Sequence, residues 1–391
     1  SKLVKKRNLF VAIRGKKNDG HNFIKKAVFK GAYNCVVSKN TNKISKNKII
    51  KVLNTHNFLK KLAFLKREYS NGKIIAVTGS SGKTSVKDLI GNLLKNYGET
   101  YFSPKSFNNS YGVPLSLCNL EQEHKFGVFE IGMSKKGEID ALSKIVKPNI
   151  AIITNVAEAH IENFKNLDHI AKAKGEIINN ISPSGSLIVD RDSKYYKYFK
   201  FKAIKRKIKL VSVGFNSKSD IKIVKVKDFF RYKLVTIRSF KKVYKIKIKD
   251  QLLKNITFAI AALEILNLNI NKIKNKFTKI KILEGRGKIY KIKYKNLNFN
   301  LIDESYNANP LSMKQSILNL SNIKNNNHKY VLLGDMLELG KKSQILHRKL
   351  SPIINGSNIN KLFIHGHHIM ETYKDVNKNK RGNVLQDKPD F

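Results

Sequence analysis

The sequence predicts an α/β protein with three domains, and three observations support this fold class. The chain has 391 residues, more than one average domain holds. From residue 73 onward, short apolar runs alternate with amphipathic helical patterns, which is typical of a mostly parallel sheet. A second alternation of this kind follows residue 284. We therefore place domain boundaries near 71 and 284, giving domains at 1–70, 71–283 and 284–391.

Each domain has its own pattern. The first contains two short strand-like runs, "NLFVAIRG" and "YNCVVS", around a helical segment. The middle domain contains four runs that predict buried strands of a central ATPase-type sheet: "KIIAVTG", "FGVFEIG", "PNIAIITNV" and "GSLIVD". In residues 201–250 lysine alternates with isoleucine or valine, which predicts antiparallel strands with one face in solvent. The C-terminal domain is expected to be Rossmann-like, with a helix from 311.

The net charge of +49 comes from 77 Lys and Arg against 28 Asp and Glu. Such a charge favours a polyanionic partner such as nucleic acid. However, the lysines are spread along the whole chain, and an AT-rich coding sequence would produce the same excess of Lys, Asn and Ile. A P-loop ATPase acting on nucleic acid would instead need clustered basic residues with exposed aromatics. We favour compositional bias and expect no nucleic-acid partner.

The two cysteines, Cys35 and Cys118, have neither metal-site nor disulfide spacing, which agrees with a reducing, cytoplasmic location. No apolar run approaches the roughly 18 residues needed to cross a bilayer.

Residues 78–84, "TGSSGKT", form a glycine-rich turn between a predicted strand and a predicted helix. The general phosphate-loop pattern would need glycine at Val77, so this is a shorter variant. Free N–H groups and the helix N-terminus favour phosphate, while Lys83 and Thr84 suit terminal phosphates and Mg²⁺. The alternative is a plain Gly-Ser turn. The predicted nucleotide-binding residues are Gly79, Ser80, Ser81, Gly82, Lys83, Thr84 and Ser85.

Three further residues are candidates for a metal site. Glu130 ends one apolar strand and His160 follows the next, and open α/β sheets bind ligands at such strand ends. A single Glu or His there is most often structural, but both of these follow a phosphate loop. Lys174 lies on the inward stripe of a helix predicted at 168–180, where a charge is costly unless it is paired or modified. The alternative is a polar cleft into which this lysine extends.

The segment "DESYNANP" precedes the helix from 311. Asn309 and Pro310 suit the N-cap and the first helical position, which explains them structurally. That explanation does not cover the other polar residues of this turn: Asp303, Glu304, Tyr306 and Asn307. Asp335 follows a strand, and His347 lies in the next helix, where it is equally well an ordinary surface histidine.

Together these segments resemble the Mur ligase family, the ATP-dependent amide ligases of bacterial peptidoglycan synthesis, and within it the branch that adds D-alanyl-D-alanine. The family has the short T-G-x-x-G-K-T/S loop. Eight segments match in family order: "LFVAIRGKKNDGHNFI", "TGSSGKT", "FNNSYGVPLSL", "FEIGMSKKGEI", "TNVAEAHIENF", "AKAKGEI", "DESYNANPLSM" and "LGDMLELG". The diaminopimelate- or lysine-adding branch is the alternative, but its D-N-P-R-type motif is absent.

The resemblance implies a reaction and its catalytic residues. ATP would activate the peptide carboxylate of UDP-N-acetylmuramoyl-tripeptide as an acyl phosphate, and the amine of D-Ala-D-Ala would displace phosphate. Lys83 would bind ATP, and Thr84, Glu130 and His160 would help bind two Mg²⁺ ions. Lys174 matches a lysine carried as a carbamate that supports the second ion. The protein is expected to be a monomer.

The resemblance also implies binding residues. The expected additional nucleotide contacts are Asn255, Arg286, Asp303 and Tyr306. The expected substrate contacts are Asp19, Gly20, His21, Asn108, Asn109, Asn307 and Asn309. The sequence departs from the branch at three positions. Ser110 stands where the branch usually has Glu, Gln251 stands at a position often held by His, and Glu304 replaces the second Asp of the usual motif. The family's last segment does not follow "NVLQDKPDF", so we expect an incomplete C-terminal domain.

Overall fold

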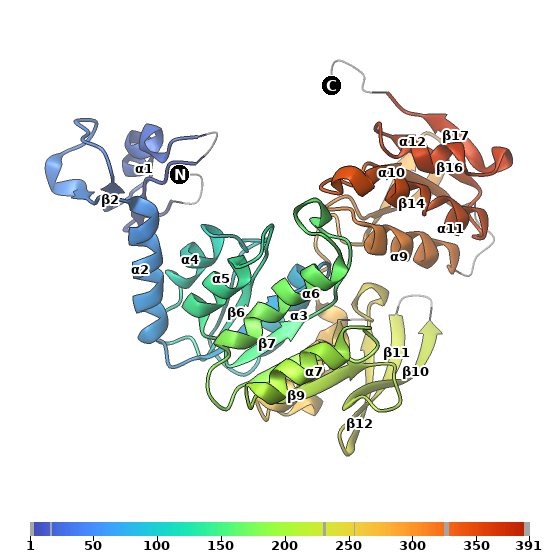
Figure 1. Ribbon diagram of the computed structural model, residues 1–391, viewed down its shortest axis with the longest axis horizontal. Helices are drawn as coiled ribbons and strands as arrows, with labels where there is room; N and C mark the ends of the chain where they lie inside the picture. Colours follow the sequence, from blue (N-terminus) through green and yellow to red (C-terminus); the bar gives the residue numbers. More distant parts are fainter. Residues whose placement is uncertain (1–3, 16–17, 230–231, 254, 324–327, 387–391) are drawn as a thin grey trace.

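The computed structural model describes residues 4–15, 18–229, 232–253, 255–323 and 328–386. The N-terminal domain, blue in Figure 1, and the C-terminal domain, orange to red, lie on opposite sides of the middle domain. The N-terminal domain is a small parallel sheet of order β1-β2-β3 with one helix packed on it. Its elements are β1 (Leu9–Val11), α1 (Ile24–Phe29), β2 (Asn34–Val37) and β3 (Ile49–Lys51).

The helix α2 (Thr55–Glu68) connects the N-terminal and middle domains. Asn54 caps it, since the side-chain oxygen accepts from the backbone N–H groups of His56 and Asn57 at 2.9 Å each. Although α2 precedes the predicted boundary near 71, it packs on helices α4 (Gly112–Leu117) and α5 (Glu138–Val146) of the middle domain. Arg67 donates to the backbone oxygen atoms of Val146 and Lys147, which anchors the end of α2 there. The exact boundary stays a prediction.

The middle domain contains a nine-stranded sheet of order β12-β11-β10-β9-β8-β7-β4-β6-β5. Strands β4 to β10 run parallel, and β10, β11 and β12 pair antiparallel. Their bounds are β4 (Lys73–Thr78), β5 (Thr100–Phe102), β6 (Phe126–Glu130), β7 (Ile150–Ile153), β8 (Ser186–Asp190), β9 (Lys209–Gly214), β10 (Ile221–Phe229), β11 (Tyr232–Ser239) and β12 (Lys242–Ile248). The predicted α/β class with a mostly parallel sheet is confirmed. In β12, Ile246 is buried and its neighbours Lys245 and Lys247 are exposed, as the alternation predicts.

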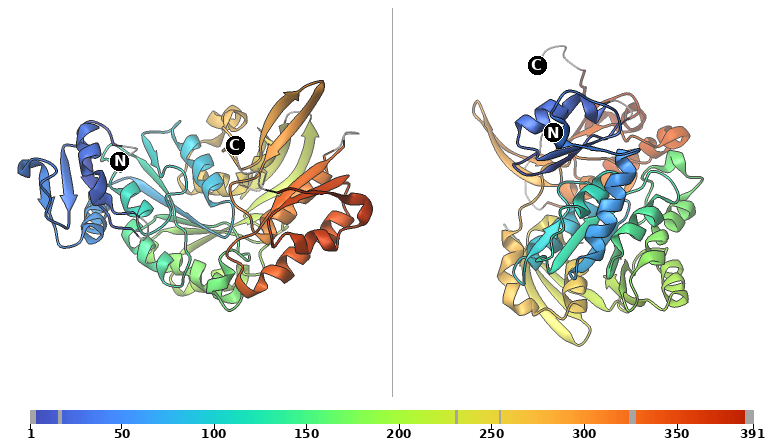
Figure 2. Two further views of the ribbon diagram at one scale, coloured as in Figure 1. Left: turned by 90° about the horizontal axis from the view of Figure 1, so that it is seen from above. Right: turned by 90° about the vertical axis from the view of Figure 1, so that its left-hand side faces the viewer.

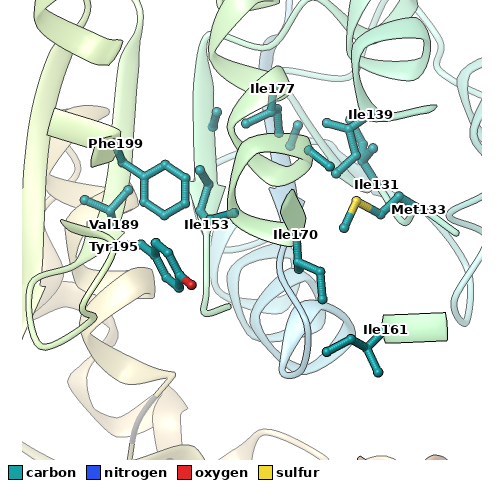
Figure 3. Packing of buried hydrophobic residues seen from close by; sticks show 14 of the residues in the cluster. Ile131, Met133, Ile139, Ile153, Ile161, Ile170, Ile177, Val189, Tyr195 and Phe199 are labelled. Atoms are coloured by element: carbon teal, nitrogen blue, oxygen red, sulfur yellow. The ribbon is translucent and has the colours of Figure 1, made fainter. Parts of the chain in front are cut away.

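Helices cover both faces of this sheet because side chains of a strand alternate between its faces. In the central strand β4, Ile75 and Val77 join an apolar cluster with α3 and α8, while Ile74 and Ala76 join a cluster with the other helices. Figure 3 shows part of the second cluster. The helices are α3 (Lys83–Leu94), α4 (Gly112–Leu117), α5 (Glu138–Val146), α6 (Leu167–Lys174), α7 (Tyr196–Lys205) and α8 (Ile256–Ile265).

The helix predicted at 168–180 is shorter than expected. The α-helix α6 ends at Lys174, and a 3-10 segment η4 (Gly175–Asn180) continues it. Glycine weakens the α-helical geometry at this junction, and 3-10 turns are frequent at helix ends. Ile170, Lys174 and Ile177 are nevertheless all buried, so the predicted inward stripe is present.

The C-terminal domain has two separate sheets. A parallel sheet contains β15 (Tyr330–Gly334), β16 (Lys361–His365) and β17 (Arg381–Val384). The strand β14 (Leu297–Asp303) pairs with β13 (Lys288–Tyr294) in a hairpin that extends away from the domain (Figure 2). Its helices are α9 (Pro310–Ser321), α10 (Ser343–Arg348), α11 (Ser351–Asn355) and α12 (Met370–Lys374). Within the described residues, no helix has the length and apolar character that crossing a bilayer requires.

Candidate active site

A large cleft runs between the middle and C-terminal domains. It is lined by the phosphate loop, by Ser106 and residues 108–110, and by residues 285–289, 297–309 and 328–335 of the C-terminal domain. The predicted nucleotide loop therefore opens onto a space that residues distant in the sequence surround.

Two glycines shape the phosphate loop between β4 and α3. Gly79 has φ 149°, and a Cβ atom there would lie 1.8 Å from the Thr154 hydroxyl oxygen, so a side chain would not fit. Gly82 has φ 78°, a left-handed conformation that glycine adopts without strain, and precedes the first turn of α3. The loop thus turns sharply enough to direct the N-terminus of α3 at the cleft.

The residues after β7 brace the phosphate loop, a role that we did not predict for them. The Thr154 hydroxyl donates to the Ser81 backbone oxygen at 2.6 Å, and the Asn155 amide donates to the Ser81 hydroxyl at 2.9 Å. The Ser80 hydroxyl donates to the Ala157 backbone oxygen at 2.9 Å. The sequence signal for this role was the polar pair Thr154-Asn155 at the end of the apolar run "PNIAIITNV".

Four predicted residues meet at the start of α3. The Thr84 hydroxyl donates to Oε2 of Glu130 at 2.6 Å, and the Asn108 amide donates to Oε1 at 2.6 Å. Arg286, 202 positions along the chain, donates to the Thr84 hydroxyl at 2.9 Å. Thr84 and Glu130 are almost fully buried. We name this group, Thr84, Asn108, Glu130 and Arg286, the Thr84–Glu130 cluster.

Lys83 and Tyr306 flank this cluster. The Lys83 ammonium donates to the Gly79 backbone oxygen at 2.9 Å, and burial lowers the pKa of Lys83 while the Glu130 charge opposes that shift. The Arg286 guanidinium lies 4.1 Å from the centre of the Tyr306 ring, a cation–π contact. The Tyr306 hydroxyl in turn contacts the hydroxyl of Ser106, a residue that we did not predict.

His160 and Lys174 lie within electrostatic reach of this group. Burial lowers the pKa of His160, the nearby Glu338 carboxylate opposes this, and the charges of Lys83 and Lys174 lower it further. His160 Nδ1 lies against the Glu338 carboxylate of the C-terminal domain, a contact that was not predicted. His160 therefore connects two domains.

Lys174 has an environment that is unusual for a lysine. Its side chain is only 2% exposed, and burial, with the like charge of Lys83, places its pKa well below the ordinary value. Among the described residues, its ammonium group has no hydrogen-bond or ion-pair partner. A buried lysine of this kind is readily deprotonated, and the neutral amine is a nucleophile.

The remaining predicted nucleotide residues divide into two kinds. Asn255 lies beside the phosphate loop, since its side-chain oxygen is 3.7 Å from the position of a Cβ on Gly82. Asp303 instead holds its own turn: it accepts from the backbone N–H of Gly285 at 2.9 Å and from the Ser305 hydroxyl at 2.6 Å, and these bonds lower its pKa. Asp303 therefore supports Arg286 indirectly, and its contact with nucleotide stays a prediction.

Several predicted substrate residues are engaged in local structure. Asn109 accepts from the backbone N–H of Gly112 at 2.9 Å at the start of α4. Asn307 is exposed and accepts from the next residue, Ala308. Asn309 and Ser312 form a capping box on α9, as its N-cap position predicts. Asn307 and Asn309 do line the cleft, as do Asn108 and Asn109.

The Asp19-Gly20-His21 motif lies in the N-terminal domain and not among the residues lining the cleft. Asp19 accepts from His21 Nδ1 at 2.6 Å and from the Lys39 ammonium at 2.9 Å, and His21 Nε2 accepts from the backbone N–H of Ser38 at 3.0 Å. A Cβ on Gly20 would lie 2.6 Å from the Ile13 nitrogen. These contacts hold the domain together, and substrate binding by the motif stays a prediction.

The Thr84–Glu130 cluster is suited to bind a hard cation that takes only a few of its ligands from the protein. Within the described part of the chain, no group of three or more His, Cys, Asp or Glu side chains could hold a metal ion. Thr84 and Glu130, however, place a hydroxyl and a carboxylate oxygen side by side. Mg²⁺ prefers such oxygen ligands and often keeps water and phosphate oxygens as the others.

Comparisons with known proteins agree with this geometry. Residues 77–264 match the family model of the Mur ligase middle domain. Over 386 residues the chain is 36% identical to the UDP-N-acetylmuramoyl-tripeptide–D-alanyl-D-alanine ligase of Rickettsia prowazekii (strain Madrid E), covering 97% of this chain and 84% of that protein. The chain belongs to this ligase family.

Solved structures of the same ligase, MurF, share the fold. MurF from Acinetobacter baumannii aligns with TM-score 0.86 at 26% identity, covering 98% of this chain and 82% of that one. MurF from Thermotoga maritima in complex with ADP aligns with TM-score 0.81 at 27% identity, covering 99% and 87%. The Mur ligase resemblance drawn from the eight motifs is therefore confirmed.

In this chain, His347 is a buried histidine that supports the wall of the cleft, and it does not lie on the surface. It is 0% exposed; its Nε2 accepts from the backbone N–H of Met336 at 2.9 Å, and its Nδ1 lies 2.8 Å from the Ser343 backbone oxygen. Burial lowers the pKa of His347, with the nearby carboxylates of Asp335 and Glu371 opposing and His368 adding to the shift.

We expect stability to fall in weak acid because of His347. Its pKa in the folded protein is below the unfolded value of about 6.5, so the unfolded chain binds the proton first. The stabilising contribution is therefore present above the unfolded pKa and is lost as the pH falls through and below it. Urea unfolding between about pH 8 and about pH 5 should show this, and His347→Gln should flatten the profile. His367→Gln, at an exposed histidine of the same domain, should not; an unchanged profile in His347→Gln would contradict the prediction.

Proposed function

We propose that this chain performs the reaction for which its relatives are named, the ATP-dependent joining of D-Ala-D-Ala to UDP-N-acetylmuramoyl-tripeptide. The observation that carries the proposal is the Thr84–Glu130 cluster. It joins a phosphate loop, a buried carboxylate and an arginine from another domain within direct hydrogen-bond contact. Family membership over nearly the whole chain supports it independently.

In the proposed reaction, an oxygen of the peptide carboxylate attacks the γ-phosphorus of ATP, and ADP leaves. The amine of D-Ala-D-Ala then attacks the acyl carbon of the acyl phosphate, loses a proton and releases inorganic phosphate. Charge accumulates on the transferred phosphoryl group, so preorganised cations and N–H donors provide most of the catalysis. Lys83, Arg286 and the N-terminus of α3 are arranged around the loop to supply them.

Thr84 and Glu130 are the residues that would hold Mg²⁺, and His160 and Lys174 would contribute to a second site. When bound, the ions neutralise the phosphate oxygens. We propose that the Lys174 amine is carbamylated: the neutral nitrogen adds to CO₂ with loss of a proton, which converts the buried amine into an anionic carbamate. Its burial, its lowered pKa and its lack of a described partner support this.

The cleft also explains how water could be kept from the acyl phosphate. Tyr306 and Glu338 of the C-terminal domain reach Ser106 and His160 of the middle domain. Such contacts between domains would enclose the intermediate, and excluding water protects reactive acyl groups from hydrolysis.

The test is phosphate release from ATP by the purified chain with UDP-N-acetylmuramoyl-tripeptide, with and without D-Ala-D-Ala, and mass spectrometry of the product. We expect release that depends on both substrates and a product heavier by the dipeptide minus water. Turnover without the dipeptide, or turnover stimulated by DNA, would refute the proposal.

A further inference from the structure

Lys87 is a buried lysine that the proposed reaction does not use. It lies on α3 one helical turn after Lys83, and it is 0% exposed. Its helix neighbours Val86, Leu89 and Ile90 belong to the apolar cluster beneath the sheet. Burial of an ammonium group is costly unless the group is well hydrogen-bonded, and an aliphatic side chain would fill the same space without that cost. The contacts of Lys87 must therefore account for it.

The Lys87 ammonium holds one turn of the chain. It donates to the backbone oxygen atoms of Ser103 at 2.5 Å and Lys105 at 2.6 Å, and lies 3.2 Å from the carboxylate of Asp88. These two carbonyl groups flank Pro104, which has no N–H to donate. Lys105 has φ 49°, a left-handed conformation that is unfavourable for a residue with a side chain. Lys87 thus stabilises a strained backbone.

That turn begins the 103–108 loop, which leads into the Thr84–Glu130 cluster. Asn108, at its end, donates to Glu130 at 2.6 Å and accepts through its backbone oxygen from Gly132 at 2.8 Å. Ser106, in its middle, contacts the Tyr306 hydroxyl. The phosphate loop is braced from elsewhere, by Thr154 and the residues after it. A shift of the 103–108 loop would therefore disturb the contact of Asn108 with Glu130 and that of Ser106 with Tyr306. The phosphate loop would keep its own support.

We infer that Lys87 is a positioning residue that, through the 103–108 loop, sets Asn108 against Glu130 and Ser106 against Tyr306. The inference deepens the proposed function and rests on it. It assigns Lys87 to the placement of Asn108, an expected substrate contact, and not to the phosphate loop, which Thr154 and Asn155 support. Asp88 supplies the nearby negative charge that makes the buried ammonium tolerable.

The test compares two variants in the full chain. Lys87→Met removes both hydrogen bonds, and we expect kcat/KM for the UDP-sugar-peptide to fall about 100-fold. Lys87→Gln keeps two N–H donors, and we expect a smaller fall of about tenfold. ADP affinity without Mg²⁺, which depends on the phosphate loop, should change less than about threefold in both when measured by calorimetry.

Lys380 provides a matched control, because it does not line the cleft. It is half-buried, and its ammonium donates to the backbone oxygen atoms of Ile354 at 3.0 Å and Ser357 at 2.5 Å, at the end of α11. Lys380→Gln removes the same kind of contact away from the 103–108 loop. We expect it to lower the melting temperature as Lys87→Gln does but to leave kcat/KM unchanged. Equal kinetic losses in both variants would show a merely structural role.

A double-mutant cycle with Asn108→Ala completes the test. If Lys87 acts through the loop, Lys87→Gln should cost much less in the Asn108→Ala background than alone. Additive losses, an equal loss of ADP affinity, or failure of both Lys87 variants to fold would overturn the assignment. A wild-type chain without ligase activity would overturn the proposed function and this assignment together, whereas an active wild type with unimpaired Lys87→Met would overturn the assignment alone.

Discussion

Replacing Lys83 with methionine is expected to lower the rate of phosphate release by about a thousandfold, because the ammonium group is positioned to meet negative charge that grows in the transition state. The side chain leaves the helix start next to the Thr84–Glu130 cluster, and its one hydrogen bond among the described residues is to the Gly79 backbone oxygen. Steady-state kinetics with saturating substrates measures the effect.

Lys95 is the control for this prediction. It lies at the other end of the same helix, is exposed, and only approaches the Phe102 ring, at 5.0 Å from its centre. Lys95→Met should keep the wild-type rate, and both variants should melt close to the wild type. A Lys83→Met enzyme that retained more than about a tenth of the rate would show that Lys83 does not bind the transferred phosphoryl group.

Replacing Lys174 with methionine is expected to separate activity from stability. Removal of a buried ammonium without a described partner should leave the free energy of unfolding unchanged or raise it by about 1 kcal/mol. The same change should lower ligase activity about 100-fold or more, since it removes the proposed carbamate from the metal site. Thermal unfolding and the ligase assay on one preparation measure both effects.

Lys172 on the same helix faces solvent and gives the matched control, Lys172→Met, which should retain activity. The carbamate has its own signature: ¹³C nuclear magnetic resonance of wild type supplied with ¹³CO₂ should show a resonance that Lys174→Met lacks. A Lys174→Met enzyme fully active without added bicarbonate would remove the carbamate role. Loss of both activity and stability would instead make Lys174 a structural residue.

Site residues that belong to a recognisable local pattern could be predicted from the sequence. A glycine-rich turn after a buried strand indicated the phosphate loop, and a carboxylate at the end of an apolar strand indicated Glu130. Helical periodicity placed Lys174 inward, where it is found. In each case the chemistry follows from neighbours a few residues away, which is why the pattern was sufficient.

Local patterns were less reliable for polar residues whose side chains bond to other groups of the protein. Asp19 and His21 have the polar composition of a binding site, yet their side chains pair with each other and with Lys39 and Ser38. His347 could not be distinguished from a surface histidine because the helix pattern does not reveal that a loop donates to its ring. The spacing in sequence between such hydrogen-bond partners follows no recognisable pattern, so it does not predict the bond.

The sequence by itself therefore determined the family, the α/β class, the phosphate loop and the inward lysine. The tertiary structure alone decided that Arg286 reaches Thr84 and that Glu338 reaches His160. It also showed that the buried Lys87 supports the loop beside Glu130. Periodicity reports which face of a strand or helix is buried, but only the packing of sheets and domains brings distant polar groups close enough to bond.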